Sequence, residues 1–393
     1  MLLDGGKNTG KIALFGSFYP NSTRAANTTN SFAYLFSLSN IFNEIIVIGN
    51  KDSNLPVFID GKISLIKSWS PDDYISLLKS FITMIRIHDT RFFFNIYMTA
   101  FGRKKVFNFM GLLLPTILSV ITRNKAIVYM HNFVETQNIE GLGYKANILT
   151  KATVHIVEKL LTSFTSVLVP LPSMAEIVNN CFGSNVKPLF IPYLETAFQF
   201  QYIKRCYKDI QHADRIPRVL LFGSWGPQKD LLGILSFLTS NIAVLKGKVE
   251  FVVAGSINVN YSYYLKSILE YTNRFPKEFL TFLMNPPEES LPELFLNSDC
   301  LLLPYNATGG QSGVLQMGAF YDLPVIAYRL PQLVEQARIL GAKVEFIEKN
   351  EPEKLLSLIL RVEVRELPTY QLLQKRFNTT LQEIKDALRY IIC

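Results

Sequence analysis

The chain has 393 residues, of which 49% are hydrophobic and 18% are charged. At about 100–200 residues per domain, this length predicts two domains, and the composition excludes a disordered chain. The four cysteines, Cys181, Cys206, Cys300 and Cys393, form no CxxC pair. That spacing argues against a zinc site or a disulfide framework and favours a reducing compartment.

The N-terminal half contains short apolar segments that end at glycine or proline and alternate with longer stretches. We expect a helix at Ser31–Ser39. The expected strands are Lys11–Phe15, Glu44–Ile48, Lys62–Ile66, Ala126–Met130, Ser166–Pro170 and Pro188–Pro192. The start of the chain, residues 1–10, is polar and shows no signal-peptide pattern. The apolar stretch Val106–Ile121 is shorter than the about 20 residues that span a bilayer, so we expect a buried helix there.

The net charge of +8 is unevenly distributed. Between Lys62 and Lys125 there are ten Lys and Arg residues against three Asp and no Glu, a local excess of 10 − 3 = +7. Most such segments are simply solvated basic faces. Aromatic residues among these charges favour a second interpretation, a peripheral membrane contact through residues 62–125 or a polyanionic acceptor. These aromatic residues are Phe92, Phe93, Phe94, Tyr97, Phe101, Phe107 and Phe109. No nucleic-acid motif is present, so nucleic acid is not an expected partner.

The strand pattern restarts after the polar stretch Lys204–Arg215. The expected strands are Arg218–Phe222, Val249–Ala254, Phe279–Leu283, Cys300–Pro304 and Pro324–Ala327, and a last helix is expected at Thr369–Ile391. Alternating strands and helices predict an α/β fold with open, mostly parallel sheets. We therefore expect doubly wound, Rossmann-like domains at residues 1–200 and 215–365. Residues 366–393 form a helix expected to cross back to the first domain.

In such sheets ligands bind beyond the carboxyl ends of the strands, so the residues there are site candidates. They are Gly16, Ser17, His131, Gly223, Ser224, Gly255, Asn285 and the loop after Pro304. That loop, Asn306–Val314, reads NATGGQSGV and precedes an expected helix at Leu315–Tyr321. Glycines allow backbone amides to approach a ligand, and amides at a helix start stabilise a phosphate. Ser312 and Gly313 are best placed to donate, although the loop could also be a plain turn.

The segment Asp299–Ala327 resembles the donor-site segment of the retaining family-4 glycosyltransferases with GT-B fold. The matching positions are Asp299, Pro304, Tyr305, Ser312, Gly313 and Pro324–Ala327, and Glu335 falls at the place of a family glutamate. The resemblance implies GT-B architecture, with two Rossmann-like domains facing across a cleft. It also implies that donor binding involves Gly310, Gln311, Ser312, Gly313, Val314 and Glu335.

The stretch Leu220–Leu238 resembles the opening strand and loop of that family's second domain. Gly223, Trp225 and Lys229 match, whereas Gly226 replaces a frequent arginine and Asp230 replaces a glycine. The resemblance implies that the Lys229 ammonium neutralises the donor diphosphate. The alternative is an exposed lysine at a helix start.

Two acidic residues that the family often carries around the phosphate loop are missing. Their places fall near Gly309 and Met317, as in a subset of similar sequences with SGV in the loop. Gln311 or Gln316 could supply a neutral hydrogen bond instead. In the N-terminal half, Lys11–Pro20 resembles the first strand and loop of the family, but the usual glycine pair is replaced by Thr23–Asn30.

Ala126–Phe133 resembles the strand that carries a histidine near the reacting sugar, which makes His131 a catalytic candidate together with Lys229. His88, His155 and His212 are expected to be structural. The family's chemistry relies on positioning and on charge stabilisation at the leaving diphosphate, with retention and without a metal.

The resemblance thus implies a hexosyltransferase that uses a nucleotide-diphosphate sugar as co-substrate and no further cofactor. The expected acceptor is a glycan or a lipid-linked sugar, and the expected location is the cytoplasm at the inner face of the membrane. A catalytically degenerate subunit that binds nucleotide sugar or a partner transferase is the main alternative. A membrane-surface binding module is another. An epimerase or a phosphorylase on the same fold would need residues or a length that this chain does not have.

Overall fold

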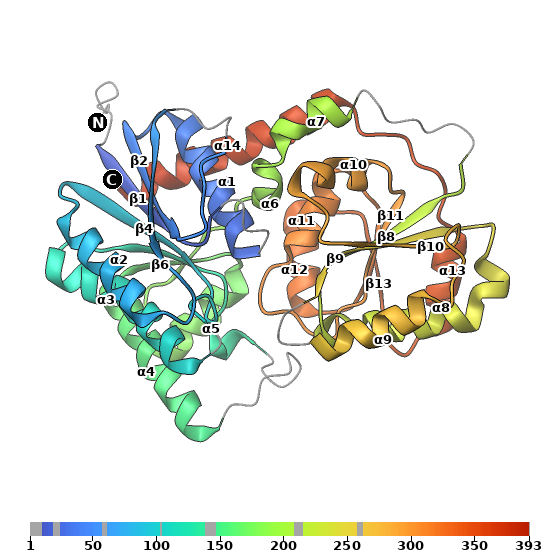
Figure 1. The fold of residues 1–393 in the computed structure, drawn as a ribbon, viewed down its shortest axis with the longest axis horizontal. Coiled ribbons are helices and arrows are strands. Elements are labelled where there is room, and N and C mark those ends of the chain that lie inside the picture. Colours follow the sequence, from blue (N-terminus) through green and yellow to red (C-terminus); the bar gives the residue numbers. More distant parts are fainter. Residues whose placement is uncertain are drawn as a thin grey trace. The chain divides into compact units, whose positions relative to one another are not determined.

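The computed structural model describes residues 10–18, 24–56, 61–102, 104–137, 147–207, 215–257 and 262–392. These residues form two compact units (Figure 1). The first contains the described residues up to 198 together with 378–392, and the second contains those from 199 to 377.

The first unit is built on a seven-stranded parallel sheet with the order β3-β2-β1-β4-β5-β6-β7. Its strands are β1 Lys11–Phe15, β2 Glu44–Asn50, β3 Ile63–Trp69, β4 Thr90–Ile96, β5 Ile127–Met130, β6 Ser166–Val169 and β7 Lys187–Pro188. The strand order reverses between β1 and β4. Strand β1 pairs in parallel with β2 on one side and with β4 on the other. This is the doubly wound arrangement expected from the alternating pattern.

Helices cover both faces of this sheet. They are α1 Arg24–Ser39, α2 Tyr74–Arg86, α3 Lys105–Thr122, α4 Ile148–Phe164, α5 Pro172–Phe182 and α6 Leu194–Ala197. Right-handed crossovers place α2, α3, α4 and α5 on one face, where Leu77, Met84, Leu118 and Leu161 pack into a core against the sheet. α3 lies between α2 and α4 (Figure 1).

Strand β4 was missed by the sequence pattern, and this corrects the interpretation of the aromatic residues. Phe92, Phe93 and Phe94 lie in β4 and are at most 4% exposed, and Phe101 and Phe107 are also buried. An unbroken apolar run is what a strand covered on both faces requires. These rings fill the core of the unit, and they do not form an interfacial patch.

The second unit contains a six-stranded parallel sheet with the order β10-β9-β8-β11-β12-β13. Its strands are β8 Arg218–Trp225, β9 Glu250–Ile257, β10 Leu280–Met284, β11 Cys300–Leu303, β12 Val325–Tyr328 and β13 Val344–Ile347. β8 and β9 run past the glycines at which the sequence predicted their ends. β13 was not predicted, because its residues alternate with charged ones along an edge of the sheet.

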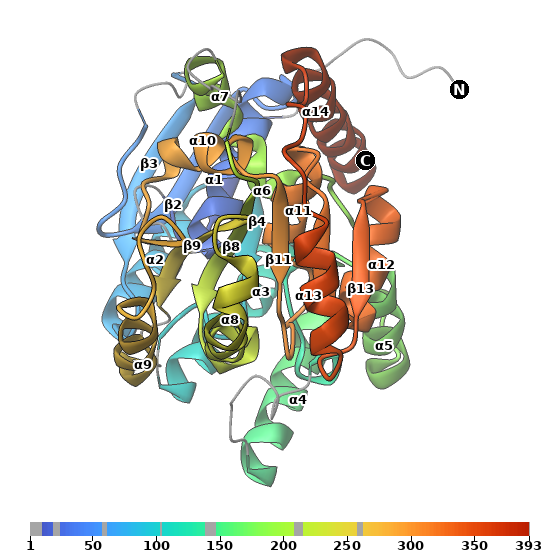
Figure 2. The ribbon, with the colours of Figure 1, turned by 90° about the vertical axis from the view of Figure 1, so that its right-hand side faces the viewer.

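The helices of this unit again lie on both faces (Figure 2). They are α7 Phe200–Cys206, α8 Leu231–Leu245, α9 Ser262–Thr272, α10 Leu291–Leu296, α11 Gly313–Phe320, α12 Pro331–Leu340 and α13 Pro352–Leu360. Ile234, Ile268 and Ile359 bring α8, α9 and α13 into one core with the sheet. Two parallel, doubly wound α/β sheets confirm the predicted fold class.

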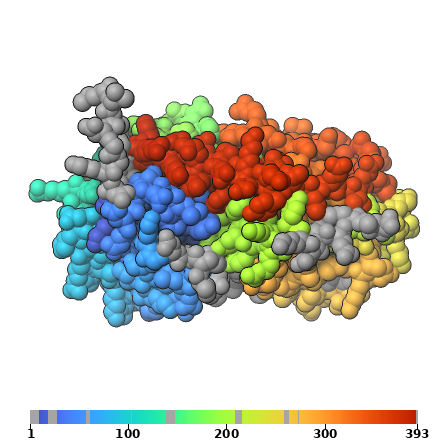
Figure 3. All heavy atoms as spheres, turned by 90° about the horizontal axis from the view of Figure 1, so that it is seen from above, coloured from blue at the N-terminus to red at the C-terminus, as the bar shows by residue number. Residues whose placement is uncertain are grey.

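The C-terminal helix α14 (Tyr370–Ile392) contributes residues to both units. Within the first unit, the Thr380 hydroxyl donates to the Pro192 carbonyl at 2.8 Å, and Lys187 Nζ donates to the Tyr390 hydroxyl at 2.8 Å. Within the second, Arg376 donates to the Phe320 carbonyl at 2.7 Å. The C-terminal segment is exposed on the face seen in Figure 3 (red).

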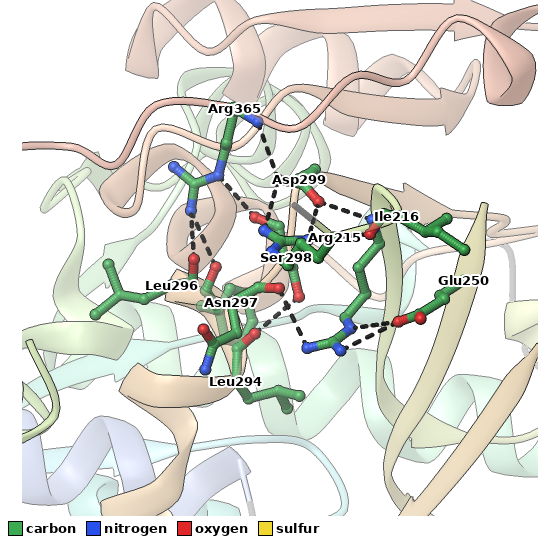
Figure 4. A network of polar contacts seen from close by, with 11 residues as sticks. Arg215, Ile216, Glu250, Leu294, Leu296, Asn297, Ser298, Asp299 and Arg365 are labelled. Atoms are coloured by element: carbon green, nitrogen blue, oxygen red, sulfur yellow. Dashed lines mark hydrogen bonds and ion pairs between the residues drawn. The ribbon is translucent and has the colours of Figure 1, made fainter. Parts of the chain in front are cut away.

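Asp299, which matched the family pattern, organises the interior of the second unit. It directly precedes β11, at the amino edge of the sheet, and its side chain has no exposed surface. It accepts from both terminal nitrogens of Arg215, at 2.6 and 2.9 Å, and from the amide of Arg365 at 3.0 Å (Figure 4). Ligands bind at the opposite edge of a parallel sheet, so Asp299 is a structural residue.

Candidate functional site

The second unit has its switch point between β8 and β11, which pair side by side although their crossovers leave in opposite directions. Ligands bind in the crevice at this place in open α/β sheets. Two segments reach it: the end of β8 with the 3-10 turn Pro227–Lys229, and the loop from Pro304 to Ser312. The sequence-predicted donor residues Gly223, Ser224, Lys229, Gly310 and Gly313 all belong to these segments or to the helix start that follows.

Gly223 and Gly255 face each other across β8 and β9, and a side chain at either position would meet neighbouring atoms. A Cβ on Gly255 would lie 1.9 Å from the Gly223 carbonyl oxygen, and both residues have positive φ, +125° and +153°. A Cβ on Gly223 would lie 2.3 Å from Lys229 Nζ. The Lys229 ammonium therefore lies directly over the bare backbone at Gly223.

Two aromatic rings surround the same ammonium. Lys229 Nζ lies 4.9 Å from the ring centre of Tyr305 and 5.8 Å from that of Trp225. The Trp225 ring is fixed because its indole N–H donates to the Ala254 carbonyl at 3.0 Å. Rings at such distances attract a cation and hold it in place. Lys229 is thus a positioned cation at the switch point and not a freely extended lysine at a helix start.

Asn306 joins the 3-10 turn Pro227–Lys229 to the Gly-rich loop Asn306–Ser312, which we call the phosphate loop after its predicted role. Its amide N–H donates to the Gln228 carbonyl at 2.9 Å, and its side-chain Nδ2 donates to the Pro227 carbonyl at 3.1 Å. Lys349 Nζ in turn donates to Asn306 Oδ1 and pairs with Asp230, each at 2.9 Å. Asp230 adopts φ +40°, a conformation that glycine favours. These contacts fix the spacing between the ammonium and the loop.

The phosphate loop departs from the prediction at Ser312. Its amide N–H donates to Gln336 Oε1 at 2.7 Å, and Gln336 Nε2 donates back to the Ser312 carbonyl at 2.8 Å. The Ser312 hydroxyl caps helix α11 by accepting from the Leu315 amide. The prediction that the Ser312 amide donates to a phosphate is therefore wrong for this conformation, because that amide is already bonded. Gly313 and Val314, at the start of α11, are the remaining candidates.

Gln311 and Gln316 are also committed inside the unit. Both are at most 1% exposed, and Gln316 Nε2 donates to Gln311 Oε1 at 2.9 Å. Their predicted role as substitutes for the missing acidic pair is not what this packing favours. Gly310 is buried, with φ +139°, and its amide N–H donates to the Thr308 hydroxyl at 3.1 Å. The two glutamines shape the loop from beneath.

Three predicted donor residues of the second unit, Asn285, Ser224 and Glu335, lie around this edge. Asn285 follows β10, is exposed, and donates its amide to the Gly255 carbonyl at 2.7 Å. Ser224 is exposed beside Gly223. Glu335 lies half-buried on α12, next to Gln336. Sequence reasoning missed the contacts of Gln336 and Asn306. The only signal for Gln336 was its place beside Glu335, and the only signal for Asn306 was its place in the Gly-rich loop.

The first unit has its own switch point, between β1 and β4, and Gly16 lies there. A Cβ on Gly16 would lie 2.6 Å from Thr29 Oγ1 and 3.3 Å from the Asn95 carbonyl oxygen. Only glycine allows this approach of α1 and the end of β4. Ser17 follows and is half-buried. In the stretch Thr23–Asn30, which replaces the glycine pair, Thr23 lies outside the described residues and the Thr28 hydroxyl donates to the buried Glu195 at 3.1 Å.

His131 directly follows β5, as predicted, and its ring is only 2% exposed. It stacks on Tyr97 with ring centres 3.9 Å apart, and its Nε2 lies 2.7 Å from Asn95 Oδ1. Asn95 Nδ2 donates to Thr29 Oγ1, so the oxygen of its amide faces the ring. In the tautomer with the hydrogen on Nε2, His131 donates to Asn95 Oδ1, and Nδ1 is the nitrogen that can accept a hydrogen bond. Asn95 was missed by sequence reasoning because β4 was missed.

A second group of titratable side chains lies close along the chain, around the turn Val134–Thr136. Glu158 is buried and accepts from the Val134 amide at 3.1 Å, while His155 Nδ1 lies 3.0 Å from Glu135 Oε1. Burial, and then the neighbouring Glu135 carboxylate, raise the pKa of Glu158 well above its usual range. Burial acts to raise the pKa of Glu135, but hydrogen bonds from Glu158 and His155 lower it, and the net pKa lies below its usual value.

The Oε2 atoms of both glutamates are buried without another partner, so one proton shared between them satisfies the pair. His155 thus makes structural contacts, as the sequence predicted. His88 is exposed beside β4, and His212 lies outside the described residues. Within the described ranges, no three His, Cys, Asp or Glu side chains gather in a group that could hold a metal ion.

Comparisons with known proteins come from structure alone. No family model matches the sequence, and no curated protein matches it. Among solved structures, HepE from Anabaena in complex with UDP superposes with a TM-score of 0.63 at 13% identity, over 97% of this chain and 99% of that one. A UDP-forming α,α-trehalose-phosphate synthase from Burkholderia xenovorans gives 0.60 at 10% identity, over 96% and 95%.

Sucrose-phosphate synthase from Thermosynechococcus elongatus gives a TM-score of 0.61 at 12% identity, over 96% of this chain and 94% of that one. HepE was also solved with UDP-glucose. All of these structures are GT-B glycosyltransferases, and the match extends over nearly the whole of each chain. The chain therefore has the GT-B fold, as predicted.

Proposed function

We propose that the protein is a glycosyltransferase that moves a sugar from a nucleotide-diphosphate sugar to a glycan or lipid-linked acceptor. One observation carries the proposal: the Lys229 ammonium lies over the bare backbone of Gly223, at the switch point and beside a Gly-rich loop. A ligand with a diphosphate fits this combination of a fixed cation, exposed backbone and helix start. UDP-sugars are the first donors to test, since neighbours of the same fold were solved with UDP and UDP-glucose.

The chemistry that this arrangement suits is departure of the nucleoside diphosphate. Negative charge grows on the leaving diphosphate as the anomeric bond breaks, and a preorganised ammonium stabilises that charge. Lys229 is held between two rings, so little reorganisation accompanies the step. We propose that the amides of Gly313 and Val314 bind the same diphosphate. Asn306 and Gln336 are positioning residues that act through the two loops.

We further propose that the reaction proceeds with retention and without a metal, as in the family-4 type with an SGV loop. In that route the leaving diphosphate accepts the proton of the acceptor hydroxyl, so no pair of catalytic carboxylates is needed. The bond between the anomeric carbon and the diphosphate oxygen breaks, and a bond between the anomeric carbon and the acceptor oxygen forms. His131 contributes to the sugar-binding side of the reaction, with its ring fixed by Tyr97 and Asn95.

We place the reaction in the cytoplasm at the inner face of the membrane, with a hexose as the transferred sugar. The excess of basic residues between Lys62 and Lys125 supports an anionic acceptor or surface on the first unit. A transfer assay with matched lipid-linked and soluble sugar acceptors tests this. Transfer to a soluble sugar alone contradicts the acceptor class but leaves the donor chemistry intact.

The first experiment measures binding and slow hydrolysis of UDP-, GDP- and ADP-sugars by wild type, Lys229→Ala and Lys229→Arg. We expect one donor to bind and turn over in the wild type. Loss of one positioned cation contact typically costs about 10²–10³-fold in turnover, and arginine restores part of it. Lys246→Ala is the matched control, because this lysine is exposed and pairs only loosely with Glu278 at 3.8 Å.

An alternative function is a catalytically degenerate subunit, favoured by the non-acidic residues at Gly309 and Met317. Such a subunit binds UDP or GDP with a Lys229-dependent affinity but does not hydrolyse or transfer any sugar. If no nucleotide binds at all, the proposed donor site is wrong. The anomeric proton coupling of the product, measured by NMR, decides between retention and inversion.

A further inference from the structure

Helices α2, α3 and α4 form one layer on the first unit and have two different faces. Their inner faces bury side chains such as Leu77, Leu118 and Leu161 in the core against the sheet. α3 packs against both α2 and α4, and Lys105 Nζ of α3 donates to Thr150 Oγ1 of α4 at 3.0 Å. The outer faces of the three helices therefore point away from the sheet together, as the lower left of Figure 1 shows.

The outer faces carry aliphatic side chains at helical spacing, where a solvated helix would carry polar ones. Ile156 is 60% exposed, Ile121 is 53% exposed and Ile82 is 48% exposed. The exposed apolar residues of the layer are Tyr74, Ile75, Leu78 and Ile82 on α2, Val106, Ile117, Val120 and Ile121 on α3, and Ile148, Leu149, Ile156, Leu160 and Phe164 on α4. We call these residues the aliphatic face. Monomeric soluble proteins rarely expose so many neighbouring apolar side chains.

Positive charge accompanies the aliphatic face. The basic residues in these helices or at their ends are Lys79, Arg86, Lys104, Lys105, Arg123, Lys125, Lys151 and Lys159. The three helices contain a single acidic residue, Glu158, which is buried against the turn after β5, and Asp72, Asp73 and Asp89 lie at the ends of α2. The layer thus exposes apolar and basic side chains side by side, and its helical sequences contribute no exposed carboxylate.

We propose that this layer docks on the surface of an anionic lipid bilayer. Aliphatic side chains enter the boundary between headgroups and acyl chains, and the lysines and arginines contact the anionic headgroups. A protein partner would favour aromatic anchors and mixed charges at its interface. The aliphatic face has two aromatic residues among thirteen, Tyr74 and Phe164, and basic flanks, which favour lipid. Docking is peripheral: α3 is long and apolar enough to cross a membrane, yet its inner face is part of the core.

This inference differs from the contact expected through residues 62–125. Of the seven aromatic residues that suggested the contact, five are buried in the core and Tyr97 and Phe109 are half-buried, and α4, which lies outside that range, supplies five of the exposed apolar side chains. It deepens the proposed function, because a bilayer-docked first unit can meet an acceptor that is anchored in the same bilayer. It does not depend on the donor chemistry, so the two can fail separately.

The test is co-sedimentation of the full chain, without nucleotide, with phosphatidylcholine vesicles that contain or lack phosphatidylglycerol. Variant Ile82→Ser/Ile121→Ser/Ile156→Ser changes one exposed residue on each helix. The control Val244→Ser/Leu269→Ser/Ile339→Ser changes three comparably exposed apolar residues on helices of the second unit. We expect binding that requires phosphatidylglycerol, weakens at high ionic strength, and falls by about tenfold or more in the first variant alone.

Two results overturn the inference. One is vesicle binding that does not depend on the aliphatic face: either the wild type does not bind anionic vesicles, or the first variant binds them as well as the wild type does. The other is a wild type that sediments as a dimer in analytical ultracentrifugation and becomes monomeric in the first variant, which would mean that a second copy covers the aliphatic face. Donor hydrolysis measured without vesicles keeps the proposed function separate, since the three substituted residues belong to the first unit and Lys229 belongs to the second.

Discussion

Replacing Asp299 by asparagine tests the structural role that the geometry gives to a residue of the donor-site motif. The Asp299 carboxylate has no exposed surface and accepts hydrogen bonds from two nitrogens of Arg215 and from the amides of Arg218 and Arg365. Asparagine keeps one acceptor oxygen but turns an NH2 group toward these donors. It also leaves the Arg215 guanidinium without its countercharge.

The size of the effect follows from burial. Removing one partner of a buried ion pair costs about 3–5 kcal/mol, which for a unit of this size lowers the melting temperature by roughly 6–20 °C. Arg365 adds to the cost, because it ties the same region together by donating to the Ser298 carbonyl at 2.7 Å and the Tyr321 carbonyl at 2.8 Å. Burial lowers the pKa of Arg365 to about 10, so it stays charged at neutral pH.

Calorimetry and urea denaturation of the full chain measure this loss in Asp299→Asn. The matched control is Glu348→Gln, which removes an ion pair with Arg329 in which both side chains are 54% exposed. An exposed pair is worth about 0–1 kcal/mol. If the two variants lose the same stability, the structural reasoning is refuted. Donor affinity measured well below the melting temperature should stay unchanged in Asp299→Asn, since this residue lies at the amino edge of the sheet.

Three further predictions concern the two units separately. Gly223→Ala should weaken donor binding by about tenfold or more while the chain still folds, because its methyl group takes the place of the Lys229 ammonium; isothermal calorimetry measures it, and unchanged affinity contradicts the site. Gln336→Leu leaves the buried amide N–H and carbonyl of Ser312 unbonded, so it should lower the free energy of unfolding by about 1–3 kcal/mol and raise the donor Kd. A loss of stability without a change in Kd refutes the positioning role. Glu158→Gln should match wild type at about pH 4 and become increasingly more stable than wild type as the pH rises, because an acid whose pKa is raised by folding loses stability through that range. Urea denaturation across pH decides it, and a difference that does not grow with pH contradicts the proton shared with Glu135.

The sequence alone identified much of the fold. Strand β1 matches its predicted bounds, and β2, β5, β6 and β10 differ by two residues or fewer at their ends. Short β-branched runs that end at glycine are a local signal, and the alternation with helices defines a doubly wound sheet. The same local signal placed Gly223 and the Gly-rich loop at carboxyl ends of strands, where the structure has them.

What the sequence misjudged were the residues whose role depends on distant partners. The run Phe92–Phe94 is compatible with a surface or a core, and only its pairing with β1 and β5 made it a buried strand. Ser312 had the right spacing for a phosphate ligand, yet Gln336, 24 residues away along the chain, occupies its amide. No local pattern contains that information.

The sequence by itself determined the fold class and the chemistry present at the strand ends, since both follow from spacing along the chain. Tertiary structure decided which of those groups are already bonded and which helix faces remain exposed. Burial and hydrogen bonding are properties of contacts between segments far apart in sequence. For that reason the aliphatic face of α2, α3 and α4 and the tethered lysine at Gly223 became visible only in the folded chain.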